Sequence, residues 1–180
     1  MVKSIAIVGG SSDIAKSTIS SMSADNYKFH VLVRDDSHTD ELSASGVSVV
    51  LGDATSEEDI KNFISGVKES GEIHAILHCV GSFAVRPPHA MNKEAFETVI
   101  STNLTSAFLT LSIAGKAMLS QGHGRMVFMS SVAGSLGLVN HEAISAAKGG
   151  IESMVRSAAA TYANRGLRIK WIRIIPQCKR

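Results

Sequence analysis

The stretch Ser4–Ala15, which reads SIAIVGGSSDIA, contains the transition that decides the fold. Its apolar run through Val8 is typical of a strand that is buried on both faces of a parallel sheet. Gly9 and Gly10 follow, and two glycines permit a tight turn in which the backbone approaches a ligand closely. A helical pattern then begins at Asp13, and a helix N-terminus presents free N–H groups and a positive dipole end. The stretch therefore predicts a strand, a phosphate-binding turn and a helix.

The same alternation of short apolar runs and longer helical patterns continues along the chain. Apolar runs predict strands at Ser4–Val8, Lys28–Val33, Val47–Leu51, Ala75–Cys79, Arg125–Met129 and Leu167–Ile175. Helical patterns predict helices at Asp13–Ser23, Ser56–Lys68, Lys93–Ser120 and His141–Ala163. No repeat or linker divides the chain, so we expect residues 1–180 to form a single dinucleotide-binding domain. The predicted fold is α/β: a Rossmann-type, doubly wound parallel sheet of about six strands with helices on both faces.

The composition bounds the classes of function. The 180 residues are 44% hydrophobic and 19% charged, with a formal net charge of +2, which is ordinary for a soluble globular domain. Lysines and arginines are scattered, so we expect no nucleic-acid partner. The chain shows no signal-peptide layout and no apolar stretch that approaches the ~20 residues of a membrane span, so we expect a cytoplasmic protein without a membrane partner. The two cysteines give neither a disulfide framework nor a metal-ligand spacing.

Several motifs follow one another in the order and spacing of one known family. The first turn is similar to the fingerprint T-G-x-x-x-G-x-G, although Asp13, which could instead cap the helix, and Ala15 replace its two later glycines. Three further motifs match the same family: STNL at 101–104, SSVAG at 130–134 and SAAKGG at 145–150. Over essentially its whole length the chain resembles the short-chain dehydrogenase/reductase family. The resemblance implies a nicotinamide dinucleotide whose pyrophosphate contacts the first turn, at Gly9, Ser11, Ser12 and Ile14.

The end of the second strand bears on the choice of dinucleotide. An acid there would hold the ribose 2′-OH of NAD, whereas an arginine accommodates the 2′-phosphate of NADP. Val33 occupies the position of the family's NAD-type acid and Arg34 follows it, so we expect NADP(H) rather than NAD(H). The alternative is a solvated surface arginine that pairs with Asp35 or Asp36.

The resemblance implies two more cofactor contacts. Asp53 resembles the family's acid that contacts the adenine, although it could equally be a turn residue. Gly81 resembles the glycine that lets the cofactor pass close to the backbone. His78 and Cys79 replace two asparagines that usually precede this glycine, and we assign His78 no catalytic role.

The resemblance also implies a catalytic set. Asn103 matches an asparagine that supports a water relay, Ser131 a serine that orients the carbonyl, and Lys148 a lysine that binds the ribose and depresses the pKa of a catalytic tyrosine. That tyrosine would lie four residues before the lysine, about one helical turn away, and this position is Ile144. Isoleucine cannot donate a proton. The nearest replacement is His141, which could instead be a helix-start residue exposed to water.

Three functions remain open at this point. The first is a divergent NADP(H)-dependent oxidoreductase that acts on a small carbonyl or alcohol substrate, with His141 or a water as the proton source. The second is a catalytically inactive NADP(H)-binding protein with a sensing or assembly role. The third is a P-loop protein, because Gly10–Ser17 differs by one residue from G-x-x-x-x-G-K-[ST].

The C-terminal end bears on assembly. The resemblance implies that the chain continues after the sixth strand through a Pro-Gly turn into a substrate-covering segment and a seventh strand. Here Pro176 is followed by Gln177, and the sequence ends at Arg180. We therefore expect the sixth strand to be an exposed apolar edge, which predicts a homo-oligomer, with a truncated product or a marginally stable fragment as alternatives.

Overall fold

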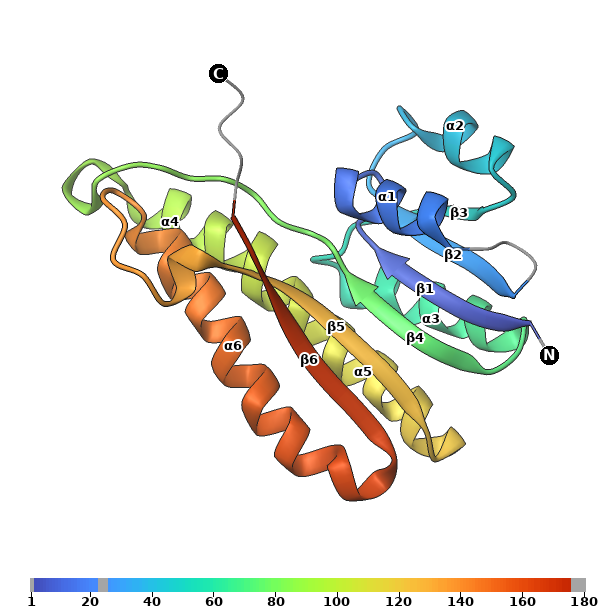
Figure 1. Cartoon of the computed structure of the whole chain (residues 1–180). Coiled ribbons are helices and arrows are strands. Elements are labelled where there is room, and N and C mark those ends of the chain that lie inside the picture. Colours follow the sequence, from blue (N-terminus) through green and yellow to red (C-terminus); the bar gives the residue numbers. More distant parts are fainter. Residues whose placement is uncertain (1, 23–25, 176–180) are drawn as a thin grey trace.

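The sheet has the topology that the sequence predicts. The computed structural model describes residues 2–22 and 26–175. Six parallel strands follow the order β3-β2-β1-β4-β5-β6 (Figure 1). Their bounds are β1 Lys3–Val8, β2 Tyr27–Val33, β3 Ser48–Leu51, β4 Ile73–His78, β5 Gly124–Ser131 and β6 Leu167–Ile174. The strand order reverses between β1 and β4, and ligands bind at such a switch point. The predicted Rossmann-type, doubly wound fold is confirmed.

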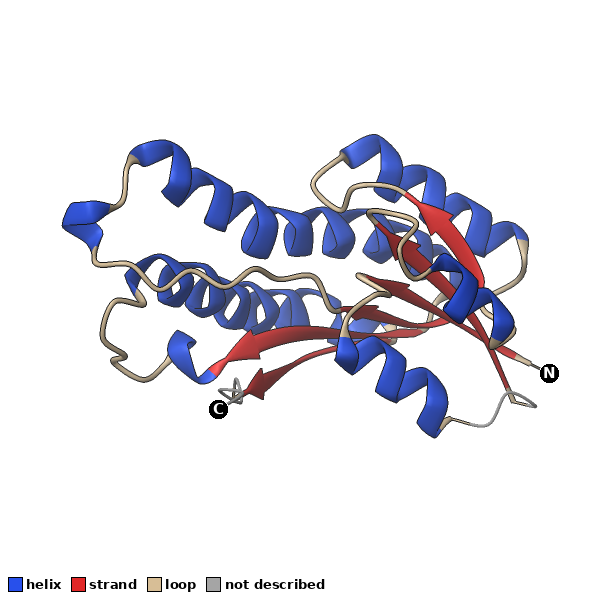
Figure 2. Ribbon diagram, turned by 90° about the horizontal axis from the view of Figure 1, so that it is seen from above, coloured by secondary structure: helices blue, strands red, loops and turns tan. Residues whose placement is uncertain are grey.

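Helices cover both faces of this sheet (Figure 2). The helices are α1 Asp13–Ser21, α2 Thr39–Ala44, α3 Glu57–Glu69, α4 Lys93–Ile100, α5 Ser106–Gln121 and α6 Glu142–Tyr162, with short helical turns η1 Pro88–Ala90, η2 Ser101–Thr105, η3 Val132–Gly134 and η4 Ala163–Arg165. The four predicted helices begin within one residue of their predicted starts, and Ser23 lies outside the described residues. Helix α2 was not predicted, because its six residues have no side-chain cap and bury only Leu42.

Two apolar layers join the helices to the sheet. On one face, Ile7 and its neighbours pack against Ala15 of α1 and Leu42 of α2. On the other face, Val8 belongs to a larger cluster with buried residues of α3, α5 and α6. Successive strand residues point to opposite faces, so a strand covered on both sides must be apolar at nearly every position. This explains why the strands appear in the sequence as continuous apolar runs.

The predicted helix Lys93–Ser120 is continuous through Gln121 but contains one π-helical turn. In η2 the N–H of Ser106 donates to the carbonyl of Ser101, five residues earlier. Turns of this kind inside α-helices occur frequently at functional sites. The centre of this one is Asn103, which is fully buried.

The length and composition of this same helix would allow it to cross a membrane. An 18-residue window within Lys93–Gln121 has a mean hydropathy of 1.2, which corrects the expectation that no stretch is long and apolar enough. However, 44% of that window is buried inside the protein, and a core helix passes the same test. The feature is therefore weak evidence for a membrane span.

One ion pair with a buried carboxylate and a half-exposed arginine ties α6 to the last two strands. Glu152 of α6 is 3% exposed, and its two carboxylate oxygens accept from Nε and Nη2 of Arg173 in β6, at 2.8 Å each. The hydroxyl of Ser130 in β5 donates to the same carboxylate at 3.0 Å. Ser130 and Arg173 are register partners on neighbouring strands. The pair therefore fixes α6 against β5 and β6 directly beside Ser131.

We predict that Glu152→Gln lowers the free energy of unfolding by about 1–3 kcal/mol at pH 7, because Arg173 and Ser130 lose a charged acceptor. The hydrogen bond from Arg173, followed by that from Ser130, holds the pKa of Glu152 below its ordinary value. Such a carboxyl contributes stability above its unfolded pKa of about 4.3 and loses it as the pH falls through the lower folded pKa. The destabilisation should therefore shrink below about pH 4 in urea denaturation.

Glu97→Gln is the matched control, because Glu97 forms an exposed ion pair with Lys93 in α4. An exposed pair of this kind should change the free energy of unfolding by less than about 0.5 kcal/mol. Equal stabilities of Glu152→Gln and the unmutated protein at pH 7 would contradict the role assigned to the buried pair.

Candidate active site

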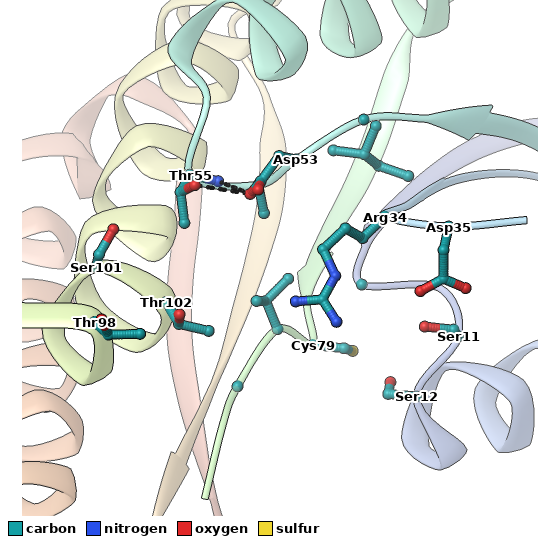
Figure 3. A pocket seen from close by; sticks show the side chains of 16 residues that line it. Ser11, Ser12, Arg34, Asp35, Asp53, Thr55, Cys79, Thr98, Ser101 and Thr102 are labelled. Atoms are coloured by element: carbon teal, nitrogen blue, oxygen red, sulfur yellow. Dashed lines mark hydrogen bonds between the residues drawn. The ribbon is translucent and has the colours of Figure 1, made fainter. Parts of the chain in front are cut away.

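Two neighbouring cavities open at the carboxyl ends of the strands. The larger, of about 490 Å³, is formed by the turn after β1, the ends of β2 and β3, the loop after β4 and one side of α4 and η2 (Figure 3). The smaller, of about 230 Å³, is formed by the same loop after β4, the ends of β5 and β6 and the start of α6. Gly81 lines the larger cavity and Ser82 the smaller one, so a single loop joins them.

The turn after β1 brings the backbone to the wall of the larger cavity. The N–H groups of Gly9 and Gly10 both donate to the carbonyl of Leu32 at 3.0 Å. Gly9 has a φ of +87°, and a Cβ on it would lie 2.9 Å from both the nitrogen and Cγ2 of Val80. Only glycine fits this position. The free N–H groups at the start of α1 follow directly and favour a negatively charged ligand.

The cap of α1 is Ser12, so the expectation that Asp13 caps the helix is wrong. The N–H of Ala15 donates to Ser12 Oγ at 3.2 Å, and the backbone of Ser12 is extended, as a capping residue requires. Asp13 is exposed in the first turn and does not line the cavity. Of the predicted turn residues, Gly9, Ser11 and Ser12 line the cavity, whereas Ile14 packs into an apolar layer of the core.

The side chain of Arg34 extends into the larger cavity from the end of β2 (Figure 3). Within residues 2–22 and 26–175 it forms no salt bridge, so the expected alternative, pairing with Asp35 or Asp36, is not observed. Hydrogen bonds from Ser37 lower the pKa of Asp35, and the charge of Arg34 contributes to this shift. Arg34 is thus a cation that faces the cavity without a carboxylate in contact.

Asp53 lines the same cavity from the end of β3, the strand that pairs with β2. Its Oδ1 accepts from the N–H and the hydroxyl of Thr55, at 2.8 Å each, and these two hydrogen bonds lower the pKa of Asp53 (Figure 3). The residue therefore shapes the turn after β3 and lines the cavity as well.

Three of the predicted site residues converge where the two cavities meet. A Cβ on Gly81 would lie 3.2 Å from Asn103 Oδ1 and 3.3 Å from Lys148 Nζ, so both side chains approach this glycine. Asn103 Nδ2 donates to Ser82 Oγ at 2.9 Å, and Asn103 Oδ1 accepts from the N–H of Ser82 at 3.2 Å. Lys148 Nζ donates to the carbonyl of Met129 at 3.0 Å. The loop after β4, η2 and α6 are thereby held together.

Lys148 is a buried cation without a carboxylate partner. It is 6% exposed and takes part in no salt bridge of the described chain, and burial lowers its pKa to about 8. The two ionisable groups of β4 near it are uncharged: burial lowers the pKa of His78 to about 3 and raises that of the Cys79 thiol to about 11. A strongly perturbed group in a cleft is a functional-site candidate.

Ser131 ends β5 at the wall of the smaller cavity. Its Oγ accepts from the N–H of Ala133 at 3.2 Å, so the hydroxyl hydrogen remains available to a ligand. The next turn, η3, lies against α6 with no side chains between them. A Cβ on Gly134 would lie 3.0 Å from the nitrogen of Gly149 and 3.0 Å from the carbonyl carbon of Lys148. This backbone contact places Ser131 beside Lys148.

His141 lies at the start of α6 and is oriented by two contacts. Its Nδ1 is 2.6 Å from the carbonyl of Val139, so Nδ1 carries the hydrogen and Nε2 is left for a ligand. Its ring meets that of Phe83 edge to face, with centroids 5.9 Å apart. The preceding Asn140 has a φ of +61°, and its carbonyl accepts from the N–H of Arg86 at 2.9 Å. The half-buried imidazole lines the smaller cavity together with Ser131 and Lys148.

Ile144 forms part of the apolar wall of this cavity. It lies one turn before Lys148 on α6, is 4% exposed, and belongs to a cluster with Val99, Ala133 and Ala147. It brings no hydrogen-bonding group to the cavity. The polar groups available there therefore come from other positions, chiefly Ser131, His141 and Lys148.

The comparison with protein families shows to which family the chain belongs. The model of the short chain dehydrogenase family matches residues 3–177. The chain belongs to the short-chain dehydrogenase family.

Two of the named relatives are reductases. The 3-oxoacyl-[acyl-carrier-protein] reductase MabA of Mycobacterium tuberculosis is 30% identical over 158 residues, which cover 87% of this chain and 62% of MabA. Levodione reductase of Leifsonia aquatica is 27% identical, over 93% of this chain and 67% of that protein. The chain thus spans 62% of the length of MabA.

Solved structures share the fold over almost the whole chain. The structure of ElxO with NADP bound has a TM-score of 0.90 at 21% identity and covers 97% of this chain and 74% of that one. The structure of levodione reductase has a TM-score of 0.90 at 24% identity, over 96% and 71% of the two chains.

Membership of the short-chain dehydrogenase family removes the P-loop interpretation. Lys16 would be the phosphate-binding lysine of a P-loop, yet it donates to Glu41 Oε2 at 2.6 Å and lies 3.1 Å from His38 Nδ1. It lines neither cavity and instead ties α1 to α2. The one-residue match to the motif is therefore accidental.

Sequence reasoning missed several residues of the smaller cavity. Phe83 and Leu138 lie on loops that have no periodic pattern, and Ile174 lines the cavity only because β6 ends there. Ser82, which hydrogen-bonds to Asn103, could have been identified from the sequence, because it directly follows Gly81.

We predict that Lys148→Met raises the free energy of unfolding by about 1–3 kcal/mol at pH 7, because it removes a buried ammonium that has no carboxylate partner. Lys148 titrates at about 8 in the folded protein. An unfolded lysine titrates at about 10.4, so the unmutated protein gains stability as the pH rises between these two values. The advantage of the variant, measured by urea denaturation, should therefore disappear above about pH 10.

Lys116→Met, at an exposed position of α5, is the control and should leave the stability nearly unchanged at both pH values. If Lys148→Met were less stable than the unmutated protein at pH 7, the unpaired buried charge would not be a source of instability.

Proposed function

We propose that this chain carries an NADP(H)-dependent oxidoreductase site that interconverts a carbonyl compound and an alcohol. The observation that carries the proposal is the convergence of Lys148, Asn103 and Gly81 between two cavities. The larger cavity has dinucleotide-binding features, and the smaller one contains Ser131. The reductase names of the relatives agree with this reaction class.

The residues around the larger cavity fit a nicotinamide dinucleotide. Gly9 and Gly81 lack side chains where the backbone meets the cavity; a Cβ on Gly9 would collide with Val80, and one on Gly81 would crowd Asn103 and Lys148. Ser11 and Ser12, at the start of α1, would hold the pyrophosphate, and Lys148 would hold the ribose near the nicotinamide. When bound, the cofactor supplies or accepts the hydride.

The adenosine end of the cofactor would lie between Arg34 and Asp53. The guanidinium of Arg34 has no carboxylate in contact, so its positive charge is available to a 2′-phosphate. Asp53 would contact the adenine from the turn after β3. This arrangement is why we propose NADP(H) rather than NAD(H), and the structure of ElxO with NADP bound shares the fold.

The residues of the smaller cavity would act on the substrate oxygen. The hydroxyl of Ser131 can donate to a carbonyl oxygen and stabilise the negative charge that develops on it. Asn103 acts indirectly, because its hydrogen bonds to Ser82 fix the loop that joins the cavities. The ammonium of Lys148 adds a positive charge next to the reacting atoms.

We assign the role of general acid and base to His141, because Ile144 occupies the position where the family resemblance places a tyrosine. The bond from Nδ1 to Val139 leaves Nε2 as the group that meets the substrate. A protonated imidazole would donate from Nε2 to the oxygen during reduction, and a neutral one would accept the proton during oxidation.

The second candidate is an NADP(H)-binding protein without catalysis. It is favoured by one observation: the position of the expected proton donor is occupied by Ile144, whose apolar side chain belongs to a buried cluster. Under this function the larger cavity would still bind the cofactor, while the smaller cavity would take no part in proton transfer.

Arg34→Ala should weaken binding of NADPH by about 10- to 100-fold and change binding of NADH little, because only NADPH carries the 2′-phosphate that Arg34 would contact. The dissociation constants can be measured by the fluorescence of the reduced cofactors. Arg165→Ala is the control, since Arg165 is exposed on η4 outside both cavities. Equal affinity of the unmutated protein for NADPH and NADH would rule out the assignment.

His141→Ala should lower kcat for NADPH-dependent carbonyl reduction by ~10²–10⁴-fold, the usual contribution of a general acid, and leave NADPH binding unchanged. Adding Ile144→Tyr to this variant should restore at least about tenfold, because tyrosine brings a proton donor back to α6. His89→Ala, at an exposed histidine of η1, serves as the control for a surface imidazole.

The outcomes separate the two functions. A silent unmutated protein that Ile144→Tyr activates would mean that catalysis was lost on an intact site. If NADPH binds and neither the unmutated protein nor any variant oxidises it with a carbonyl substrate, the oxidoreductase proposal fails and the binding function stands.

A further inference from the structure

The smaller cavity is apolar over most of its wall. Phe83, Leu138, Ile144 and Ile174 come from four different segments and all line it. The side chains that can hold a substrate oxygen, Ser131 and Lys148, belong to the end of β5 and the middle of α6. If a ligand places its oxygen at these two groups, its remaining atoms must therefore lie against the apolar side chains of the wall.

The two loops beside the mouth are fixed relative to each other. The N–H of Arg86 donates to the carbonyl of Asn140 at 2.9 Å, which joins the loop after β4 to the loop before α6. The edge-to-face contact of Phe83 with His141 joins them a second time. Phe83 and Leu138 are thus held on opposite loops as parts of one wall.

Among residues 2–22 and 26–175, Lys148 is the one lysine or arginine that lines this cavity, and it lies at the junction with the larger cavity. Its Nζ is held by the carbonyl of Met129 and lies beside Gly81, at this junction. A carboxylate or phosphate at the far end of a substrate would therefore lose its hydration without gaining a cationic partner.

We propose that the smaller cavity selects a small, uncharged carbonyl compound with an aliphatic or alicyclic body, or the corresponding alcohol. This inference rests on the proposed function and names its substrate class. The volume of about 230 Å³ favours a small molecule, because pockets for drug-sized ligands usually measure about 300–1,000 Å³. Ile144 supports the selection, since it places hydrocarbon where the family resemblance places a phenol.

The reaction on such a substrate balances with the groups already named. During reduction the carbonyl carbon gains a hydride as NADPH is oxidised to NADP⁺. The π electrons of the C=O bond pass to the oxygen, which Ser131 holds by a hydrogen bond, and that oxygen takes a proton from His141. Oxidation of the alcohol reverses each transfer.

The test compares 2-hexanone with 5-oxohexanoate, which differs in carrying a carboxylate in place of the far methyl group. With NADPH, kcat/KM for 2-hexanone should exceed that for 5-oxohexanoate by at least about tenfold. Leu138→Ser should reduce this preference several-fold, because a polar group then faces the far end of the substrate. A preference of the unmutated protein for 5-oxohexanoate would overturn the inference and indicate an anionic substrate held by a cation.

Leu136→Ser is the matched control. Leu136 lies two residues before Leu138 in the same loop and is 57% exposed, but it does not line the cavity. Its variant should keep the substrate preference of the unmutated protein. If Leu136→Ser and Leu138→Ser both dissociate a dimer seen in sedimentation and neither changes the preference, the apolar loops cover a second copy of the chain and the inference fails.

A second measurement does not depend on turnover. Calorimetry on the NADP⁺-loaded protein should detect binding of hexanamide and not of hexanoate, and Leu138→Ser should weaken the former. If hexanamide binds in a protein that never oxidises NADPH, the proposed catalysis fails while the selectivity of the cavity stands. If NADPH is oxidised but hexanoate binds as well as hexanamide, the catalysis stands and the inference is overturned.

Discussion

The packing of α6 against the carboxyl end of β5 is the constraint on which the site depends. Gly134 and Gly149 let the backbone of η3 touch that of α6, where any Cβ would separate them. Lys148 then reaches the carbonyl of Met129 at 3.0 Å. The carboxylate of Glu152 accepts hydrogen bonds from Ser130 of β5 and Arg173 of β6. Because Lys148 and the carboxylate of Glu152 are buried, these contacts hold Ser131 and the ammonium of Lys148 in place without any ligand, as a preorganised site requires.

Much of this arrangement could be predicted from the sequence. Continuous apolar runs indicated a sheet covered on both faces, and the strand-turn-helix at Ser4–Ala15 indicated where a ligand meets it. The resemblance to the short-chain dehydrogenase/reductase family, and not the sheet topology, placed Asn103, Ser131 and Lys148 in one site, because Asn103 and Lys148 lie on helical segments. The convergence on Gly81 agrees with that expectation. The fold prediction is confirmed because it depends on periodicity, which a sequence records directly, whereas the site residues depended on the family resemblance and stay a prediction.

The features that could not be predicted depend on competition between similar side chains. Ser12 and Asp13 are both good capping residues, and the backbone turn decides between them. Lys16 fits a phosphate motif by position, but the unpredicted helix α2 brings Glu41 within 2.6 Å of it. The orientation of His141 depends on the left-handed backbone of Asn140 and on a loop more than fifty residues earlier. Such outcomes require the three-dimensional neighbours of each residue.

The combination of Lys148 with Ile144 has a physical consequence for the chemistry. A buried ammonium without a carboxylate partner is unfavourable, and a hydrocarbon neighbour one turn away does nothing to offset its desolvation. With a phenol absent from that position, the nearby acid whose pKa the ammonium lowers is the Cys79 thiol, which burial nonetheless keeps uncharged. Under the proposed function the remaining use of the ammonium would be electrostatic: it would hold a sugar hydroxyl and stabilise negative charge on a substrate oxygen. The proton must then come from a group that exchanges with solvent, and the half-buried imidazole of His141, held by the carbonyl of Val139, meets that requirement. Under the proposed function the site would therefore separate charge stabilisation, at Lys148, from proton transfer, at His141.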